Sequence, residues 1–124
     1  MARFAWVCLA GALGAGVRYL VGQWTLARFG AGFPWGTLAV NLVGCFLIAG
    51  IMQLAVRSTA ISPDLRVALT SGFIGGLTTY SSFNWEATRL FQDGAKGMAV
   101  VYVAVTLVGC LAAGWLGFML ARRI

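Results

Sequence analysis

The chain has 124 residues, of which 60% are hydrophobic and only 10% charged, so it lacks the polar residues that a small soluble domain needs to cover its surface. It contains no histidine, which excludes Ser-His-Asp catalysis and metal hydrolysis by a His/Asp cluster, and an enzyme is not expected. The net charge of +6 is interpreted as membrane anchoring rather than nucleic-acid binding, because most Lys and Arg side chains lie at the ends of apolar stretches.

Four long apolar stretches divide the chain, and among them they contain one charged residue, Arg18. They cover residues 4–26, 29–56, 67–85 and 97–121. A helix needs about 20 apolar residues to cross the hydrocarbon core of a lipid bilayer. We therefore expect an all-α integral membrane protein, with a single four-helix transmembrane domain over 1–124. Its approximate spans are 4–27, 35–56, 65–90 and 97–121.

The first two expected spans each contain one conspicuous polar residue. Arg18 lies several turns inside the first span, where it either draws anions into a vestibule or extends to the near membrane interface. Asn41 lies in the second span, four residues after Thr37 and on the same helix face. Its amide either bonds across to another helix or presents N–H donors to a dehydrated anion. The sequence leaves both questions open.

The third expected span contains an unusual run over 72–84, with adjacent glycines followed by two threonines and two serines. Such a run makes a poor continuous helix, because glycine is flexible and side-chain hydroxyls compete for backbone hydrogen bonds. It predicts a break in mid-span near 75–79, with the carbonyls of Gly75 and Thr78 free to hold a cation. The alternative is a kinked but continuous helix.

Two stripes of polar and aromatic side chains follow this run. Tyr80 and Phe83 share a helix face, and their ring edges are electropositive. In the fourth span, a row at four-residue spacing forms a polar track on an otherwise apolar helix; its members are Tyr102, Thr106, Cys110 and Gly114. The three cysteines of the chain are far apart and inside spans, so they are interpreted as packing residues.

The orientation of the chain in the membrane is weakly specified. Four spans place both termini on one side, which carries five positive charges, at Arg3, Arg57, Arg66, Arg122 and Arg123. The other side carries Arg28, Arg89 and Lys96. Because the Lys/Arg bias of short loops sets topology, a difference this small leaves two alternatives open: insertion in both orientations as an antiparallel homodimer, or a single orientation.

Three segments together are similar to those of a known family, the Fluc (CrcB) fluoride channels. They are Gly11-x-x-Gly14-x-x-x-Arg18-Tyr19, the run Gly36-Thr37-Leu38-Ala39-Val40-Asn41-Leu42-Val43-Gly44, and Gly72-Phe73-Ile74-Gly75-Gly76-Leu77-Thr78-Thr79-Tyr80-Ser81-Ser82-Phe83. The third is the most specific, and the resemblance covers essentially the whole chain. It implies an antiparallel, dual-topology homodimer with two pores, each lined by both subunits. It also implies a multi-pass protein of the bacterial inner membrane that exports fluoride passively.

The resemblance also implies roles for individual residues in a fluoride pore. Asn41 would donate hydrogen bonds to fluoride, and the ring edges of Tyr80 and Phe83 would face the ion. Tyr102 and Thr106 match the polar track of the family. The chain departs from the best-known members at Tyr80, where they have Phe, so the effect of the added hydroxyl on conduction is an open question.

Further residues are assigned by the same resemblance. Ser81 joins the polar track, and Arg18 lies beside a vestibule. The backbone carbonyls of Gly75 and Thr78, two from each subunit, would hold a central Na⁺ that is structural and not transported.

Two other functions compete with a fluoride channel. A small multidrug-type, proton-coupled exporter has a similar size, but it needs an intramembrane carboxylate, and Glu86 is the only one near a span. A membrane scaffold protein would explain the glycine-rich faces as packing surfaces, but it leaves the run over 72–84 without a purpose.

Overall fold

The computed structural model describes every residue from Met1 to Ile124, and all its regular elements are helices. Three helices are long: α1 (Ala2–Phe29), α2 (Trp35–Arg57) and α6 (Lys96–Ala121). The others are shorter: α3 (Pro63–Val67), the π-helix η1 (Ala68–Ile74), α4 (Gly75–Leu77) and α5 (Tyr80–Gln92). The expected all-helical fold is confirmed.

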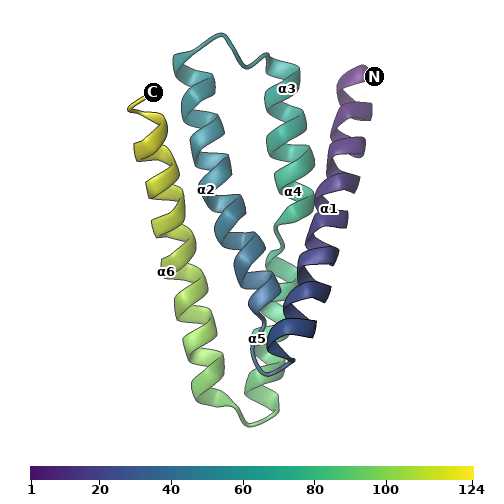
Figure 1. Cartoon of the computed structure of the whole chain (residues 1–124), viewed down its shortest axis with the longest axis vertical. Coiled ribbons are helices and arrows are strands. Elements are labelled where there is room, and N and C mark those ends of the chain that lie inside the picture. Colours follow the sequence, from purple (N-terminus) through teal and green to yellow (C-terminus); the bar gives the residue numbers. More distant parts are fainter.

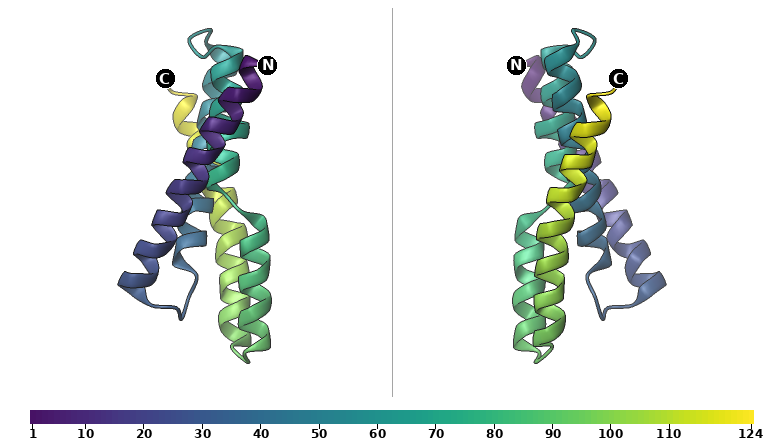
Figure 2. Two further views of the ribbon diagram at one scale, coloured as in Figure 1. Left: turned by 90° about the vertical axis from the view of Figure 1, so that its right-hand side faces the viewer. Right: turned by 90° about the vertical axis from the view of Figure 1, so that its left-hand side faces the viewer.

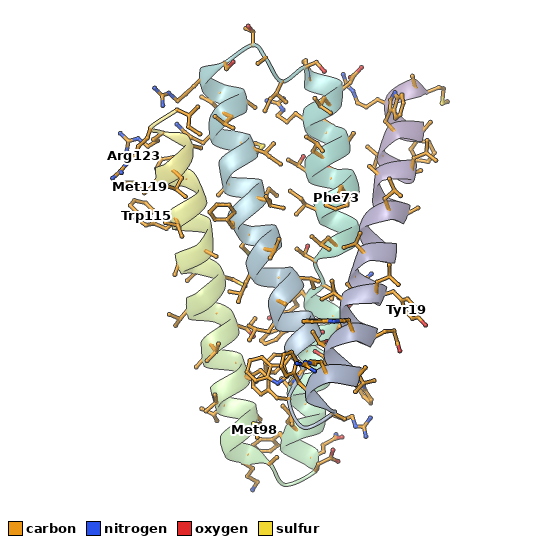
Figure 3. The ribbon with its side chains drawn as sticks, in the orientation of Figure 1. Tyr19, Phe73, Met98, Trp115, Met119 and Arg123 are labelled. Atoms are coloured by element: carbon orange, nitrogen blue, oxygen red, sulfur yellow. The ribbon has the colours of Figure 1, made fainter.

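The long helices have the character of membrane-spanning segments. By length and composition, α1, α2 and α6 are each able to cross a membrane. Large apolar side chains on them are exposed; Tyr19 and Trp115 point away from the bundle on opposite sides (Figure 3). Surfaces of this kind are stable against lipid rather than water. The chain is therefore a membrane protein with several apolar helices.

The helices pass four times along the long axis of the molecule (Figure 1). Both termini and the loop between α2 and α3 lie at one end, and α3, η1, α4 and α5 together return the chain to the other. At that second end, α5 and the first half of α6 diverge from α1 and the start of α2 (Figure 2). The bundle thus resembles an inverted V that opens away from the termini.

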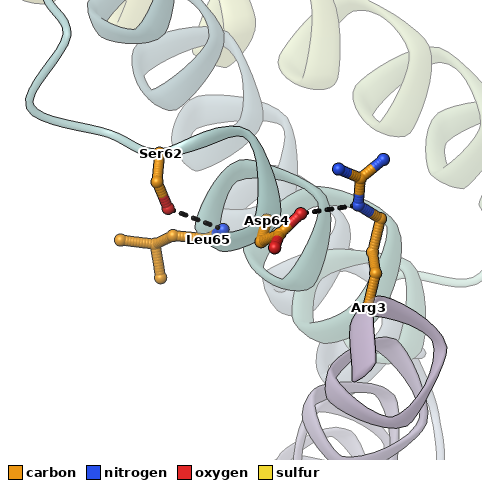
Figure 4. A network of polar contacts seen from close by, with 4 residues as sticks. All are labelled: Arg3, Ser62, Asp64 and Leu65. Atoms are coloured by element: carbon orange, nitrogen blue, oxygen red, sulfur yellow. Dashed lines mark hydrogen bonds and ion pairs between the residues drawn. The ribbon is translucent and has the colours of Figure 1, made fainter. Parts of the chain in front are cut away.

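The end of the bundle near the termini is closed by local contacts (Figure 4). Ser62 caps α3, because its Oγ accepts a hydrogen bond of 3.2 Å from the Leu65 N–H, and Pro63 follows at the first helical position. Asp64 then forms an ion pair of 2.6 Å with Arg3 of α1. Both partners are exposed, so the pair adds at most about 1 kcal/mol, but it fixes where α3 begins against α1.

The third pass, from α3 to α5, differs from an ordinary helix in two ways. After α3 it has the wide turns of η1, where the Gly75 N–H donates to the carbonyl of Thr70, five residues earlier. Helical geometry then ends at Leu77, and Thr78 and Thr79 are extended, with ψ of 156° and 116°.

The glycines of the predicted break do not interrupt the helix. Gly75 and Gly76 remain helical in α4, so the expectation of a break over 75–79 is wrong for these two residues. The physical reason is close packing, since a Cβ at Gly76 would collide with the carbonyl of Gly11 in α1. Gly76, which has no side chain, allows α1 to approach the helix at this point.

Candidate functional site

Asn41 bridges from the middle of α2 to the extended residues that follow α4. Its Nδ2 donates to the Thr79 carbonyl over 3.1 Å, and its Oδ1 accepts from the Thr79 N–H over 2.8 Å. The side chain is 8% exposed. Of the two interpretations left open by the sequence, the structure shows the bond to a neighbouring segment. One N–H of the amide remains for a further acceptor.

The extended residues leave two backbone carbonyls without their helical donors. In a continuous helix, the Thr79 N–H would donate to Gly75 and the Ser82 N–H to Thr78. Here the Thr79 N–H donates to Asn41, and the Ser82 N–H donates to Thr79 Oγ1 over 3.1 Å. The two carbonyls released in this way are those that the sequence analysis selected as cation ligands.

Arg18 takes a position that neither interpretation of the sequence described. Its Nε donates a hydrogen bond of 3.0 Å to the carbonyl of Gly76, at the C-terminal end of α4. A guanidinium is favourable there, because the last carbonyls of a helix lack backbone donors and carry partial negative charge. Arg18 therefore ties α1 to the end of α4.

Aromatic rings form a continuous row beyond the extended residues. The rings of Tyr80 and Phe83 meet edge to face, with centroids 5.5 Å apart, and Phe83 meets Tyr102 of α6 in the same way at 5.2 Å. Phe83 is 5% exposed, whereas Tyr80 is 75% exposed. Edge-to-face packing holds Phe83 in one orientation, while Tyr80 leaves a large part of its ring uncovered in a single chain.

Glu86 is a site residue whose role sequence reasoning missed. Thr37 Oγ1 donates to its Oε1 over 2.8 Å, and the Tyr102 hydroxyl donates to its Oε2 over 2.7 Å. The sequence analysis treated Glu86 only as a carboxylate that an exporter would need, and Tyr102 as a pore hydroxyl. The available signal was physical: a carboxylate among apolar residues requires donors, and the neighbouring stripes contain few.

A groove brings most of the predicted pore residues together. It has a volume of ≈ 440 Å³ and lies between α2, the end of the η1–α4 segment, α5 and α6. Four of the predicted pore residues line it, namely Asn41, Tyr80, Phe83 and Thr106. Thr78 and Thr79 also line it, and none of its lining residues carries a formal charge.

The other predicted residues lie beside this groove. Ser81 is exposed and its Oγ is 3.2 Å from Thr79 Oγ1. Tyr102 is fully buried behind Phe83. Gly75 is exposed one turn before the extended residues, and Arg18 contacts α4 from α1. The structure therefore brings part of the predicted set together in the groove and leaves Ser81, Tyr102, Gly75 and Arg18 outside it.

Thr106 carries the one buried side-chain polar atom that has no hydrogen-bond partner. Its residue is 5% exposed, and its Oγ1 faces neither a backbone carbonyl nor another side chain within bonding distance. Buried hydroxyls are nearly always bonded, so an orphan of this kind indicates a missing partner. The groove thus combines uncharged hydrogen-bond donors and aromatic ring edges with no fixed charge.

Comparison with known proteins agrees with this geometry. A family described as "CrcB-like protein, Camphor Resistance (CrcB)" matches residues 5–118. A protein of Citrifermentans bemidjiense named "Fluoride-specific ion channel FluC" is 50% identical over 124 residues, which is all of both chains. Proteins of the same name from Anaeromyxobacter dehalogenans and Geobacter sp. strain M21 are 51% and 49% identical, over 98% and 100% of this chain and 97% and 100% of their own. The chain therefore belongs to the CrcB family.

Proposed function

We propose that this protein is a passive, fluoride-selective channel that lets fluoride leave the cytoplasm. Relatives of about 50% identity match this chain over 97–100% of their own length. They are named as fluoride-specific ion channels, and none of these names is that of an enzyme. The observation that carries the proposal is the uncharged groove that gathers Asn41, Phe83 and the orphan hydroxyl of Thr106.

Fluoride is small and holds its water tightly, so a permeation path must replace that water with donors of similar strength. The free N–H of Asn41, the hydroxyl of Thr106 and the electropositive ring edges of Tyr80 and Phe83 are such donors. A fixed positive charge in the groove would bind the anion too strongly for it to leave. In this mechanism Asn41 has two roles, since the same amide also holds the peptide group of Thr79.

Further hydroxyls lie beside this path on α5 and α6. Ser81 offers a hydroxyl next to the groove, and Tyr102 offers one when its bond to Glu86 exchanges. Glu86 lines a second cavity, of ≈ 450 Å³, at the end of the molecule that opens away from the termini. We assign this cavity as an aqueous approach to the path. Arg89 lines it and supplies positive charge there, and Arg18, midway along α1, would supply positive charge to a vestibule beside the path.

We further propose that two chains pair in antiparallel orientation as a homodimer in the bacterial inner membrane. The groove is open on the side of a single chain, where Thr79 is half-buried and the ring of Tyr80 is exposed, and polar groups of this kind are unfavourable against lipid. A second copy would cover them and complete the wall of the pore. The weak charge bias between the two ends of the chain is compatible with insertion in both orientations.

A sodium ion on the axis of this dimer is the third part of the proposal. The carbonyls of Gly75 and Thr78 have lost their helical donors, and a two-fold axis would bring two such pairs together as four oxygen ligands. The ion would be structural, not transported. A structural sodium ion predicts a higher thermal unfolding midpoint in NaCl than in N-methylglucamine chloride of equal ionic strength. Equal midpoints in the two salts would contradict the sodium site.

The function is tested by reconstituting the purified chain in liposomes loaded with KF and following release with a fluoride electrode. The proposal predicts fluoride efflux driven by the fluoride gradient, no chloride efflux from KCl-loaded liposomes, and no dependence on an imposed proton gradient. Efflux that requires a proton gradient would instead favour a proton-coupled exporter acting through Glu86.

A further inference from the structure

Three aromatic rings separate the groove from the cavity that Glu86 lines. The two spaces share no lining residue: Phe33 lines the cavity, and Phe83 lines the groove. Tyr102 lies between them and is fully buried. Its ring meets Phe33 edge to face with centroids 5.3 Å apart, and it meets Phe83 in the same way at 5.2 Å. We call these three residues the aromatic partition.

The aromatic partition is about one helical turn thick. On α2, Thr37 lines the cavity, and Asn41, four residues later, lines the groove. On α5, Glu86 lines the cavity, and Phe83, three residues earlier, lines the groove. Residues at these spacings are separated by about 4.5–6 Å along a helix axis. The rings are therefore the layer that an ion must pass between the two spaces.

Phe33 is the one member of the partition that does not belong to a helix. It lies in the loop between α1 and α2, at the end of the molecule away from the termini (Figure 1). Pro34 has φ of −80° and ψ of 66°, and the Trp35 N–H donates to the Phe33 carbonyl over 2.9 Å, which is an inverse γ-turn. The Trp35 ring also packs against Phe33, with centroids 4.6 Å apart. This turn holds the Phe33 ring against Tyr102.

The partition offers little to a water molecule. The hydroxyls nearest to it belong to Thr37 and Tyr102, and both already donate to Glu86. Buried water needs two to four polar partners, and an apolar constriction without water blocks ions that keep their hydration shell. An ion in the partition would meet mainly ring edges, which are electropositive.

We propose that Phe33 is a specificity-determining residue, whose ring keeps water and hydrated anions in the cavity from entering the groove. Removal of the ring would join the two spaces and let a larger halide, such as chloride, pass with its water. The identity of the conducted ion rests on the proposed function. The separation of the cavity from the groove does not depend on it.

Selectivity is measured as the ratio of initial chloride efflux to initial fluoride efflux, from liposomes loaded with KCl or KF. Phe33→Ala should raise this ratio at least about tenfold over the wild type, and Phe33→Leu, which keeps most of the apolar volume, should raise it less. The matched control is Leu42→Ala. Leu42 packs against the same cluster of Leu38, Phe83 and Tyr102 but lines neither space, so its loss destabilises the same core without opening the partition.

Two outcomes would overturn this role of Phe33. One is a wild-type ratio in folded Phe33→Leu and Phe33→Ala proteins. The other is an equal rise in Leu42→Ala, which would show that a loosened core alone admits chloride. If Phe33→Ala does not fold, Phe33→Leu decides between these results.

Water access is measured without a conducted ion, by alkylation in sealed liposomes with iodoacetate. In a background of Cys8→Ser and Cys45→Ser, the remaining thiol, Cys110, lines the groove. Adding Phe33→Ala should speed alkylation of Cys110 at least about tenfold, and adding Leu42→Ala should not. Equal rates with and without the Phe33 ring would overturn the partition. Faster alkylation in a protein that never conducts fluoride would refute the proposed function and leave the partition standing.

Discussion

At the scale of single residues, Asn41 connects the local fold to the proposed permeation path. Its amide donates to the Thr79 carbonyl and accepts from the Thr79 N–H, so it both holds the extended residues and frees the carbonyl of Gly75. Only an amide provides a donor and an acceptor at this spacing. The same side chain keeps one N–H directed at no partner, which is the one we assign to the anion.

The substitution Asn41→Asp tests this double role. A carboxylate would still accept from the Thr79 N–H, but its second oxygen would face the Thr79 carbonyl and repel both that carbonyl and an anion. We expect fluoride efflux to fall by about tenfold or more, while the protein still elutes as an assembled dimer. The matched control is Gln53→Glu, the same change near the end of α2 and outside the groove. Equal losses in both variants would contradict the assignment.

Thr106 gives a prediction in which stability and flux change in opposite directions. An unsatisfied buried hydroxyl costs about 1–3 kcal/mol, so Thr106→Val should raise the thermal unfolding midpoint of the purified protein. The same change removes a donor from the groove and should lower fluoride efflux. In the control Thr70→Val, the lost hydroxyl is already bonded to the Arg66 carbonyl, so neither quantity should rise and efflux should be unchanged. A fall in both quantities for Thr106→Val would contradict the role of this hydroxyl.

Helical periodicity in the sequence predicts that some of the site residues lie close together, but it does not predict the contacts of the others. Asn41, Phe83 and Thr106 lie on definite faces of three helices, and their polar or aromatic character on an apolar background indicated that these faces meet. The bond from Tyr102 to Glu86 and the bond from Arg18 to Gly76 depend on how α6 and α1 are placed in three dimensions. No spacing along the chain contains that information.

At the scale of elements, the third pass, from α3 to α5, shows what glycine-rich runs do and do not specify. The run over 72–84 indicated an irregular segment, and the extended residues Thr78 and Thr79 lie within it. The π-helix η1 was not expected, because a wide turn arises from packing against neighbouring helices and has no signature in composition.

The packing role of the glycines is tested by comparing two alanine substitutions. A methyl group at Gly76 would collide with the backbone of α1, and overpacking of this kind costs about 1–3 kcal/mol. Gly97 is also helical but has open space around it. We expect Gly76→Ala to lower the thermal unfolding midpoint and Gly97→Ala to leave it equal or higher, since alanine favours the helix. A similar shift in both variants would contradict close packing of α1 against α4.

At the scale of the whole molecule, the sequence specified the number of passes but not the orientation of the chain. The apolar stretches indicated four helices of membrane-spanning length, and three single helices meet that criterion in the structure. The third pass is divided among four shorter elements, α3, η1, α4 and α5, each too short to qualify by itself. Orientation depends on a difference of a few positive charges between the two ends, which is too small to decide it.

Dual insertion is tested by placing a reporter cysteine in the loop between α2 and α3. In a background of Cys8→Ser, Cys45→Ser and Cys110→Ser, the change Thr59→Cys provides one exposed thiol. If the chain inserts both ways, a membrane-impermeant maleimide should label about half of the copies in sealed inner-membrane vesicles, and all of them after detergent is added. Labelling of nearly all copies, or of nearly none, in sealed vesicles would establish a single orientation.

The central claim is that fluoride crosses the membrane through the groove whose wall includes the ring of Phe83. The most direct measurement compares initial fluoride efflux from KF-loaded liposomes for the wild type, Phe83→Ile and Phe91→Ile. Phe91 lies on the same helix but is exposed outside the groove, so it is a matched control. The account predicts that Phe83→Ile abolishes efflux in a folded dimer while Phe91→Ile conducts like the wild type. Undiminished fluoride efflux in the Phe83→Ile channel would contradict it.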